Sequence, residues 1–268
     1  KSPSSDYHVD EMFVFNEGIG AVYKKFIRGR VSVVGSLKNN SVEVTQRDRF
    51  QKSDPSILFI TSWEPKLGAN IAFALNANNE PVDYDDYYRP EEHALQTCLE
   101  FAISRGMKVR VLGRTESSRG DEFEYYAKRL IDFEFIPRTT WRASYEHIDL
   151  AEMVMTTDST LGYECLVRGS RVVLYSCRGS VLKSESSNFG WPTPMPTRGP
   201  FWSSVDDREH LRACLDFVAT ITNEDWHRIT SEIKPFLMAH DEGNSVFGAW
   251  LRGIQNCNTP RDVGLISQ

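Results

Sequence analysis

The sequence lacks long apolar runs, a basic excess and paired cysteines, and each absence excludes a class of protein. No stretch approaches the roughly 18 to 20 apolar residues that a membrane-spanning helix needs, and the N-terminus shows no signal-peptide pattern. The formal net charge of −6 argues against a nucleic-acid partner, because no excess of Lys and Arg is present to displace phosphate counterions. We therefore expect a cytoplasmic protein without a transmembrane segment, although peripheral association with the inner face of the membrane stays open.

Cysteines are few, and none stands in a CxxC pair. The five positions are Cys98, Cys165, Cys177, Cys214 and Cys257. An odd number at wide spacing favours buried reduced thiols over a disulfide framework or a zinc site. The acidic segment 83–92 (DYDDYYRPEE) offers carboxylates, but nothing in its spacing fixes the geometry of a cation site. We therefore predict no metal site and no cofactor.

Several common enzyme signatures are also missing. The sequence contains no Walker A motif, no GxSxG nucleophile elbow and no internal repeat. Gly18 and Gly20 begin a GxGxxG pattern, but the residues that follow do not complete it. A nicotinamide-dependent enzyme of the standard type is disfavoured accordingly.

Apolar, β-prone runs alternate with amphipathic segments along most of the chain. With 40% hydrophobic and 25% charged residues, the chain should bury an ordinary core. Strands are expected at 57–61, 107–114, 133–137, 153–155 and 171–179, and helices at 90–105, 122–131, 162–169, 206–221, 223–239 and 241–255. This alternation predicts an α/β fold with a doubly wound, Rossmann-like parallel sheet.

Two segments do not follow this alternation. Residues 64–89 are predicted to form a solvated loop that leads into a helix with Pro90 in its first turn. Residues 184–204 are rich in Gly, Pro and aromatics, and a loop of this length in a compact domain is usually functional or a lid. Its aromatic residues serve either in packing or as a platform for a sugar, and they are Phe189, Trp191, Phe201 and Trp202.

The chain is interpreted as one main domain with additions at both ends. Residues 1–45 contain a strand, a helix and a strand, too little to bury both faces of a sheet, and we interpret them as the remnant of an N-terminal domain. Residues 46–257 form the Rossmann-like nucleotide-binding domain, and residues 258–268 a loose tail. Because the first residue is Lys1 rather than Met, we expect a fragment of a longer protein.

The stretch 153–168 (MVMTTDSTLGYECLVR) has the pattern of a strand, a tight turn and a helix N-terminus. The first N–H groups of a helix have no partner inside it, and the helix dipole adds partial positive charge, so such a place receives anions, above all phosphate. The residues here that we assign to substrate binding are Asp158, Ser159, Thr160, Gly162, Tyr163 and Glu164.

Each of these residue types suits a part of a nucleotide. Ser159 and Thr160 can cap the helix and offer hydroxyls to a phosphate, and Gly162 lets a ligand approach the backbone. Glu164 is suited to accept hydrogen bonds from a ribose diol. The alternative is purely structural: Ser159 or Thr160 is only an N-cap, with Glu164 as its capping-box partner.

Other strand ends add polar residues to the same edge of the sheet. Ser62, Arg114 and Arg178 each follow a predicted strand, and open α/β sheets bind nucleotides at the carboxyl ends of their strands. The two arginines could neutralise a phosphate or a sugar carboxylate through a bidentate fork. Alternatively, they pair with the acidic loop 64–89.

The chain also resembles a known family. The segment DSTLGYECLVRG (158–169), followed by a strand, by FGWP (189–192) and by GPFWSS (199–204), resembles the C-terminal half of bacterial surface carbohydrate biosynthesis proteins. This is a group of GT-B glycosyltransferases related to capsule Kdo transferases. VVGSLKNN (33–40) and YDDYYRPEE (84–92) also look like that group, so the resemblance spans roughly residues 13–251.

The resemblance implies a GT-B fold, in which two Rossmann-like domains face each other and the C-terminal one holds the nucleotide of a sugar nucleotide. It places Ser159, Thr160 and Gly162 on the phosphate-binding turn and matches Glu164 to the acidic residue that commonly holds the ribose. It favours a CMP-sugar over a UDP- or GDP-sugar as donor, and a saccharide or lipid-linked acceptor. Because the acceptor site and any general base normally belong to the first domain, we assign no catalytic residue.

The leading hypothesis is therefore the nucleotide-sugar-binding half of a glycosyltransferase for surface polysaccharide or glycolipid synthesis. The alternative is a non-catalytic GT-B-like binding or scaffold domain. A sugar-nucleotide epimerase of the same fold is disfavoured, because the catalytic carboxylates that it needs cannot be picked out of the sequence.

Overall fold

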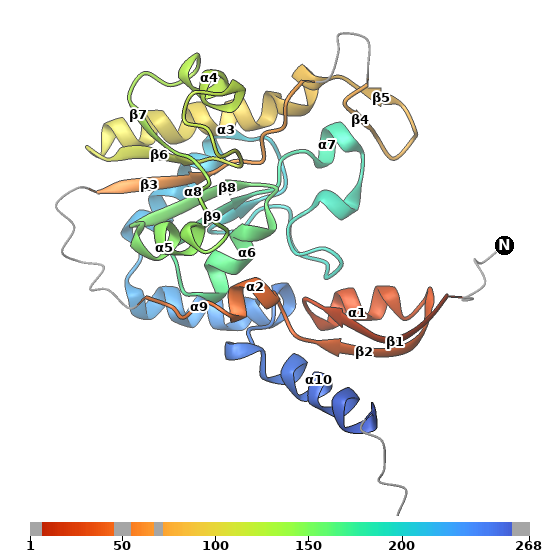
Figure 1. Cartoon of the computed structure of the whole chain (residues 1–268). Coiled ribbons are helices and arrows are strands. Elements are labelled where there is room, and N and C mark those ends of the chain that lie inside the picture. Colours follow the sequence, from red (N-terminus) through yellow and green to blue (C-terminus); the bar gives the residue numbers. More distant parts are fainter. Residues whose placement is uncertain (1–6, 46–54, 67–71, 259–268) are drawn as a thin grey trace, which may run out of the picture.

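The computed structural model describes residues 7–45, 55–66 and 72–258, and its main part is a parallel sheet of six strands. The strands are β3 (Ser56–Ile60), β6 (Lys108–Leu112), β7 (Phe133–Ile136), β8 (Met153–Thr157), β9 (Val172–Tyr175) and β10 (Trp202–Ser203). Their order in the sheet is β10-β9-β8-β3-β6-β7 (Figure 1). The chain runs outward from β3 through β6 to β7, then returns to pair β8 with the other side of β3. This confirms the predicted doubly wound, Rossmann-like sheet, with its switch point between β3 and β8.

Burial explains why the central strands could be recognised in the sequence. All residues of β3, β8 and β9 are buried, as expected where helices cover both faces of a parallel sheet. On one face, α3 (Tyr84–Ser104) packs beside α8 (Arg208–Thr220) and contacts β3, β6 and β8. Helix α6 (Thr160–Val167) contacts β8, β9 and α9 (Asn223–Leu237). Two further helices, α4 (Asp121–Ala127) and α5 (Ala143–Leu150), follow β6 and β7.

Helix α3 corrects the prediction for residues 64–89. It begins at Tyr84, where the side chain of Asp83 accepts a hydrogen bond from the N–H of Asp86 at 2.7 Å, so Pro90 lies inside the helix. Tyr84 and Tyr88 are buried against the core, and this burial outweighs the hydrogen bond that Pro90 cannot donate. Before the helix, β4 (Ala74–Leu75) and β5 (Pro81–Val82) form a short antiparallel pair within the predicted loop.

The N-terminal residues contain a strand, a helix and a strand, and their two strands form a sheet separate from the main one. Strands β1 (Tyr7–Val14) and β2 (Ile27–Val33) pair in parallel, and α1 (Glu17–Tyr23) connects them. Helix α10 (Ser245–Asn258) lies beside this unit, with the ring of Phe13 edge-on to Phe247 and Trp250 at 5.1 Å each. Short elements complete the described chain: α2 (Leu37–Asn40), α7 (Gly179–Leu182), η1 (Glu185–Ser187) and η2 (Glu242–Asn244). The predicted tail lies outside the described residues, apart from position 258, which ends α10.

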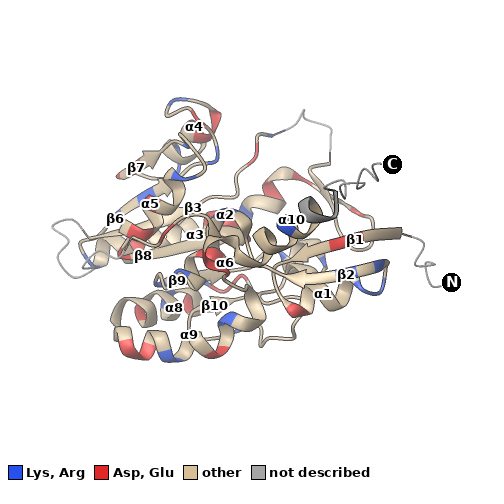
Figure 2. Ribbon diagram, turned by 60° about the horizontal axis from the view of Figure 1, so that its bottom comes forward, with Lys and Arg blue, Asp and Glu red and all other residues tan. Residues whose placement is uncertain are grey.

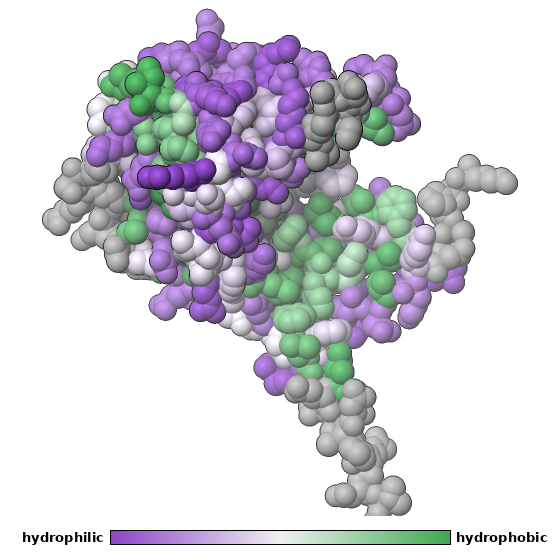
Figure 3. All heavy atoms as spheres, turned by 45° about the horizontal axis from the view of Figure 1, so that its top comes forward, coloured by the Kyte–Doolittle hydropathy of each residue, from purple (hydrophilic) through white to green (hydrophobic). Residues whose placement is uncertain are grey.

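The surface differs between the two parts. Figure 2 shows Lys and Arg interspersed with Asp and Glu along the helices, without a single basic face on the visible side. Figure 3 shows apolar residues gathered over the N-terminal unit, where a groove of about 630 Å³ is lined by side chains of β1 and α1 and by Trp191. None of the helices in residues 7–45, 55–66 and 72–258 combines the length and the apolar character that crossing a bilayer requires.

Gly162 lies where helix α6 packs closely against the sheet. A Cβ atom at this position would lie 2.4 Å from Cγ2 of Thr156 and 2.5 Å from Cδ2 of Leu174. The missing side chain therefore lets α6 lie close against β8 and β9. Gly162 does not line either of the cavities at the helix N-terminus.

We predict that Gly162→Ala lowers the free energy of unfolding by about 1–3 kcal/mol, because the added methyl group overpacks the contact between helix and sheet. The matched control is Gly253→Ala in α10, where a Cβ atom would meet nothing within 4 Å. There the better helix propensity of Ala should raise stability by up to about 1 kcal/mol. Urea unfolding of both variants measures the difference, and equal stability of the two would contradict the packing role.

Candidate functional site

Two cavities meet at the N-terminus of α6, on the carboxyl edge of the sheet. The first has a volume of about 430 Å³ and lies at the ends of β3, β6 and β8. The second has a volume of about 280 Å³ and lies at the ends of β8 and β9. Asp158, Ser159 and Thr160 line both cavities. The predicted turn is therefore the wall that the two cavities share.

The backbone of this turn presents the start of α6 to both cavities. Asp158 has a left-handed conformation with φ of 49°, which Asp tolerates better than most residues. The hydroxyl of Ser159 accepts a hydrogen bond from the N–H of Leu161 at 3.3 Å and caps the helix. The predicted cap is thus confirmed for Ser159, and Thr160 is the first helical residue.

Glu164 is not part of a capping box, because the capping-box position for the N-cap Ser159 is residue 162 and Glu164 lies two residues beyond it. Its carboxylate lines the first cavity and accepts a hydrogen bond from the hydroxyl of Tyr145 at 2.6 Å. Burial raises the pKa of Tyr145, so this hydroxyl stays protonated and keeps donating. Tyr145 thereby holds the carboxylate in place at the wall of the cavity.

The first cavity also contains cations and an aromatic side chain that the sequence prediction did not include. Lys38 of α2 and Arg138 after β7 line it, and neither forms an ion pair with another described residue. Trp141, just before α5, lines it as well. Lys38 lies about 100 residues before Arg138 and Trp141 in the chain, which both follow β7, so only the folded structure brings them together.

Arg114 lies where it was expected, at the end of β6 and in the lining of the first cavity. One guanidinium nitrogen, Nη1, donates to the carbonyl oxygens of Ser62 at 3.0 Å and Trp63 at 3.2 Å, and to the Glu64 carboxylate at 3.0 Å. The contact with Glu64 matches the alternative in which an arginine pairs with the acidic loop 64–89. Because the Arg114 side chain is 47% exposed, it can still face a ligand.

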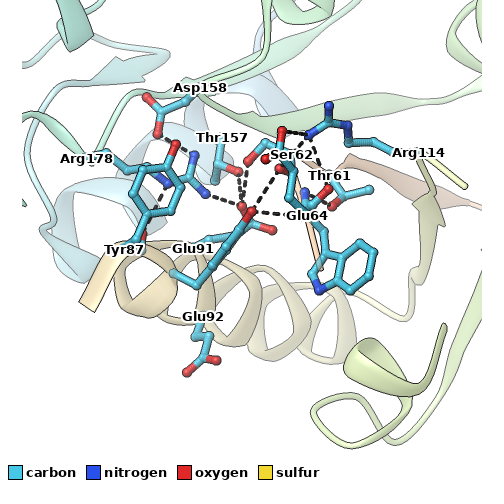
Figure 4. Close-up of polar contacts among 12 residues, drawn as sticks. Thr61, Ser62, Glu64, Tyr87, Glu91, Glu92, Arg114, Thr157, Asp158 and Arg178 are labelled. Atoms are coloured by element: carbon cyan, nitrogen blue, oxygen red, sulfur yellow. Dashed lines mark hydrogen bonds and ion pairs between the residues drawn. The ribbon is translucent and has the colours of Figure 1, made fainter. Parts of the chain in front are cut away.

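Arg178 does not present a free guanidinium to a ligand, although this was expected. Its side chain is only 1% exposed, and each guanidinium nitrogen donates to another residue of the protein (Figure 4). Its guanidinium donates to Glu91 at 2.5 Å, to Asp158 at 2.9 Å and to the carbonyl oxygen of Tyr87 at 3.2 Å. Burial opposes its charge, but the carboxylates of Glu91 and Asp158 outweigh burial and raise the pKa of Arg178. This arginine therefore holds Asp158 in position and has no free fork for a phosphate.

Glu91 is the residue of this region that sequence reasoning did not single out. Its side chain is 1% exposed, and its carboxylate accepts hydrogen bonds from Ser62 at 2.8 Å, Thr157 at 3.0 Å and Tyr126 at 2.9 Å, in addition to Arg178. The hydroxyl of Ser62 thus points to Glu91, although Ser62 lines the first cavity. A signal in the sequence could have identified Glu91. The helical spacing of Tyr84, Tyr88, Glu91, Leu95 and Cys98 places its carboxylate on the buried face of α3.

Asp158 is the ionisable group that the two cavities share. Its side chain is 18% exposed. Burial raises the pKa of Asp158 to about 6, even though the positive charge of Arg178 works in the opposite direction. The carboxylate therefore changes its charge near neutral pH, at the point where the helix N-terminus faces both cavities.

The loop 184–204 is packed against the domain by its aromatic residues. Phe189 stacks on Trp202 at 4.8 Å, and Phe189, Phe201 and Trp202 are all buried. The hydroxyl of Tyr163 accepts a hydrogen bond from the N–H of Gly190 at 3.1 Å. For these three aromatic residues the packing alternative is confirmed. Tyr163 lines the second cavity and ties the loop to α6.

Comparison with known proteins identifies the family of the chain. Residues 1–255 match the model of a family described as "putative O-antigen biosynthesis protein". The chain belongs to this family. The expected membership of a surface carbohydrate biosynthesis group is thereby confirmed, and family membership assigns the chain to surface polysaccharide synthesis. No curated protein matches its sequence.

Solved structures with a similar chain path have little sequence identity to this chain. A sucrose-phosphate synthase from Thermosynechococcus elongatus aligns with 93% of this chain at 10% identity and a TM-score of 0.47. A putative UDP-N-acetylglucosamine 2-epimerase from Listeria monocytogenes aligns with 78% of it at 12% identity and a TM-score of 0.43. The alignments cover 59% and 47% of those two chains, less than two thirds of each.

We predict that Glu91→Ala lowers the free energy of unfolding by about 3–5 kcal/mol, because it leaves Arg178 buried beside one carboxylate instead of two. The neighbouring Glu92→Ala is the control: Glu92 is 39% exposed and pairs with Arg129 at the surface, so its loss should cost about 1 kcal/mol or less. Urea unfolding measures both variants. Similar losses would show that the Glu91 network contributes no more than a surface ion pair.

Proposed function

We propose that this chain is the nucleotide-sugar-binding part of a glycosyltransferase that builds a surface polysaccharide or glycolipid. The observation that carries the proposal is the first cavity. At the switch point of a doubly wound sheet it combines a helix N-terminus, two cations without an ion pair among the described residues, an aromatic side chain and a positioned carboxylate.

Each part of a nucleotide has a matching group in this cavity. The phosphates would lie at the N-terminus of α6, beside the hydroxyls of Ser159 and Thr160. The Glu164 carboxylate, fixed by Tyr145, would accept hydrogen bonds from the ribose diol. Trp141 offers an apolar face for the base.

The charges of the cavity support stabilisation of a leaving phosphate. Lys38, Arg114 and Arg138 line the cavity and would offset the negative charge that develops on the phosphate as the sugar is transferred. Arg178 contributes indirectly, because it holds Asp158 and thereby the turn before α6.

Other parts of the proposal rest on the resemblance to GT-B enzymes. These are a GT-B arrangement with a second Rossmann-like domain, preference for a CMP-sugar over UDP- and GDP-sugars, a saccharide or lipid-linked acceptor, and work at the cytoplasmic face of the membrane. A non-catalytic binding or scaffold role is the competing proposal. Incubation of the chain with its donor and acceptor separates the two, because a scaffold would bind the donor without transferring or hydrolysing its sugar.

We predict that the chain binds at least one of a panel of CMP-, UDP- and GDP-sugars and that Glu164→Gln weakens this binding about tenfold or more. The substitution keeps the volume of the side chain and an acceptor for Tyr145 but removes the charge that would hold the ribose. Glu146→Gln is the control, since Glu146 is exposed on α5 and lines neither cavity. Isothermal titration calorimetry measures both, and the site assignment fails if no member of the panel binds or if the two variants behave alike.

We also predict that sugar-nucleotide affinity rises as the pH falls from 7 to 5, by about tenfold at most. Asp158 is mostly ionised above its pKa of about 6 and mostly neutral below it, so lowering the pH removes a negative charge from the wall that faces the phosphates. Sugar nucleotides are suitable probes because their phosphates are esterified and do not titrate in this range. In Asp158→Asn the affinity should be independent of pH over this range. If the affinity of this variant changes with pH as much as that of the unaltered protein, another group causes the effect.

A further inference from the structure

Most of the residues that line the second cavity carry a hydroxyl group. It lies between the N-terminus of α6, the end of β9 and the segment 182–188, and its volume is about 280 Å³. Leu174 and Leu182 are the aliphatic side chains in its lining. The hydroxyl-bearing residues of the lining are Tyr87, Thr156, Ser159, Thr160, Tyr163, Tyr175, Ser176, Ser186 and Ser187. A surface of this kind suits a ligand with many hydroxyl groups, because each hydroxyl can both donate and accept.

One of these hydroxyls is buried without a partner. Thr156 is 1% exposed, and its Oγ1 atom makes no hydrogen bond with any residue that the structure describes. A buried polar group left unsatisfied is costly, and such groups are uncommon in folded proteins. Because Thr156 lines the second cavity, a hydroxyl of a ligand in that cavity is the candidate partner for its Oγ1 atom.

The charges around this cavity leave no free cation for an acidic ligand. Arg178 is the cation of its lining among the described residues, and its guanidinium is occupied by Glu91, Asp158 and the carbonyl oxygen of Tyr87. With Glu91 and Asp158 ionised, these three side chains carry a net charge of −1. A ligand carboxylate would therefore meet the Asp158 carboxylate without a compensating charge.

The first cavity has the opposite character. Lys38, Arg114 and Arg138 all line the first cavity and none of them lines the second. The shared wall of Asp158, Ser159 and Thr160 lies between them. Phosphates bound at the start of α6 would thus have the cationic cavity on one side and the hydroxyl-lined cavity on the other.

We propose that the second cavity holds the sugar of the donor and selects a neutral, polyhydroxylated sugar over one that carries a carboxylate. This inference rests on the proposed function, in which the first cavity holds the nucleotide. It disfavours a sugar acid of the Kdo type as donor, although the resemblance to Kdo transferases suggests one. The hydroxyl of Thr156 contacts the sugar, and Asp158 is the residue that excludes the carboxylate.

The test compares two donors that differ at one group of the sugar, which is a carboxylate in one donor and a neutral group in the other. If uridine nucleotides bind, the pair is UDP-glucose and UDP-glucuronate; if guanosine nucleotides bind, it is GDP-mannose and GDP-mannuronate. If only cytidine nucleotides bind, the pair is CMP-sialic acid and its carboxyl methyl ester. Calorimetry should show the neutral member binding about tenfold more tightly, and Asp158→Asn should reduce this difference. Equal or tighter binding of the acidic member overturns the inference, while binding of both still supports the nucleotide site.

A second measurement tests the contact with the sugar. Thr156→Val keeps the shape of the side chain and removes the unsatisfied hydroxyl, so the melting temperature should stay the same or rise. Affinity for the sugar nucleotide should fall about threefold to tenfold, while affinity for the same nucleotide without its sugar should not change. The control is Ser170→Ala, which removes another buried hydroxyl without a described partner, outside both cavities. Equal loss of affinity for both ligands in Thr156→Val, or no loss for either, overturns the assignment of this cavity to the sugar.

Discussion

The buried guanidinium of Arg178 is the interaction on which the site depends. It lies after β9 and contacts Glu91 of α3 and Asp158 after β8, while Glu91 also accepts a hydrogen bond from Ser62 after β3. Three strand ends and one helix are thus joined through a single ion-pair network. Removing three charges from water is expensive, and the network is tolerable only because nearly every polar atom has a partner. Its benefit is geometric: it fixes the carboxyl edge of the sheet where both cavities open.

Helix α6 is held at both of its ends by buried arginines. At its start, Arg178 holds Asp158 in the turn before the cap. At its end, Arg168 donates to the Asp149 carboxylate at 2.9 Å and 2.5 Å and to the carbonyl oxygens of Val42 and Glu43, which follow α2. In its middle, Gly162 lets the helix lie directly on the sheet. The helix that faces the proposed phosphate is therefore one of the most constrained elements, and the second arginine also links it to the N-terminal part of the chain. A preorganised helix end loses little freedom when a ligand binds.

The sequence was sufficient for the parts of the fold that depend on local pattern. The apolar runs of β3, β8 and β9 and the capped turn at Ser159 follow from residue types close together in the chain, and the structure contains them where they were expected. The errors concern partners that are distant in sequence. Pro90 suggested a helix start, but burial of Tyr84 and Tyr88 extends the helix beyond it. The side chain of an arginine after a strand can face a ligand or turn inward, and only the position of a carboxylate on a neighbouring helix decides which.

The charges at the wall shared by the two cavities also depend on residues that are distant in sequence. From sequence, Arg114 and Arg178 were the cations of the site and Asp158 a polar residue of the turn. In the fold the charge of Arg178 is offset by two carboxylates, and its effect at the cavities is the placement of Asp158. The cations that remain available to a ligand are Lys38 of α2, Arg114 after β6 and Arg138 after β7, and all three line the first cavity. The N-terminus of α6 therefore has positive charge on one side and a carboxylate with hydroxyls on the other. For a sugar nucleotide, whose phosphates lie between the nucleoside and the sugar, that asymmetry favours one direction of binding, with a neutral sugar on the side that carries the Asp158 carboxylate.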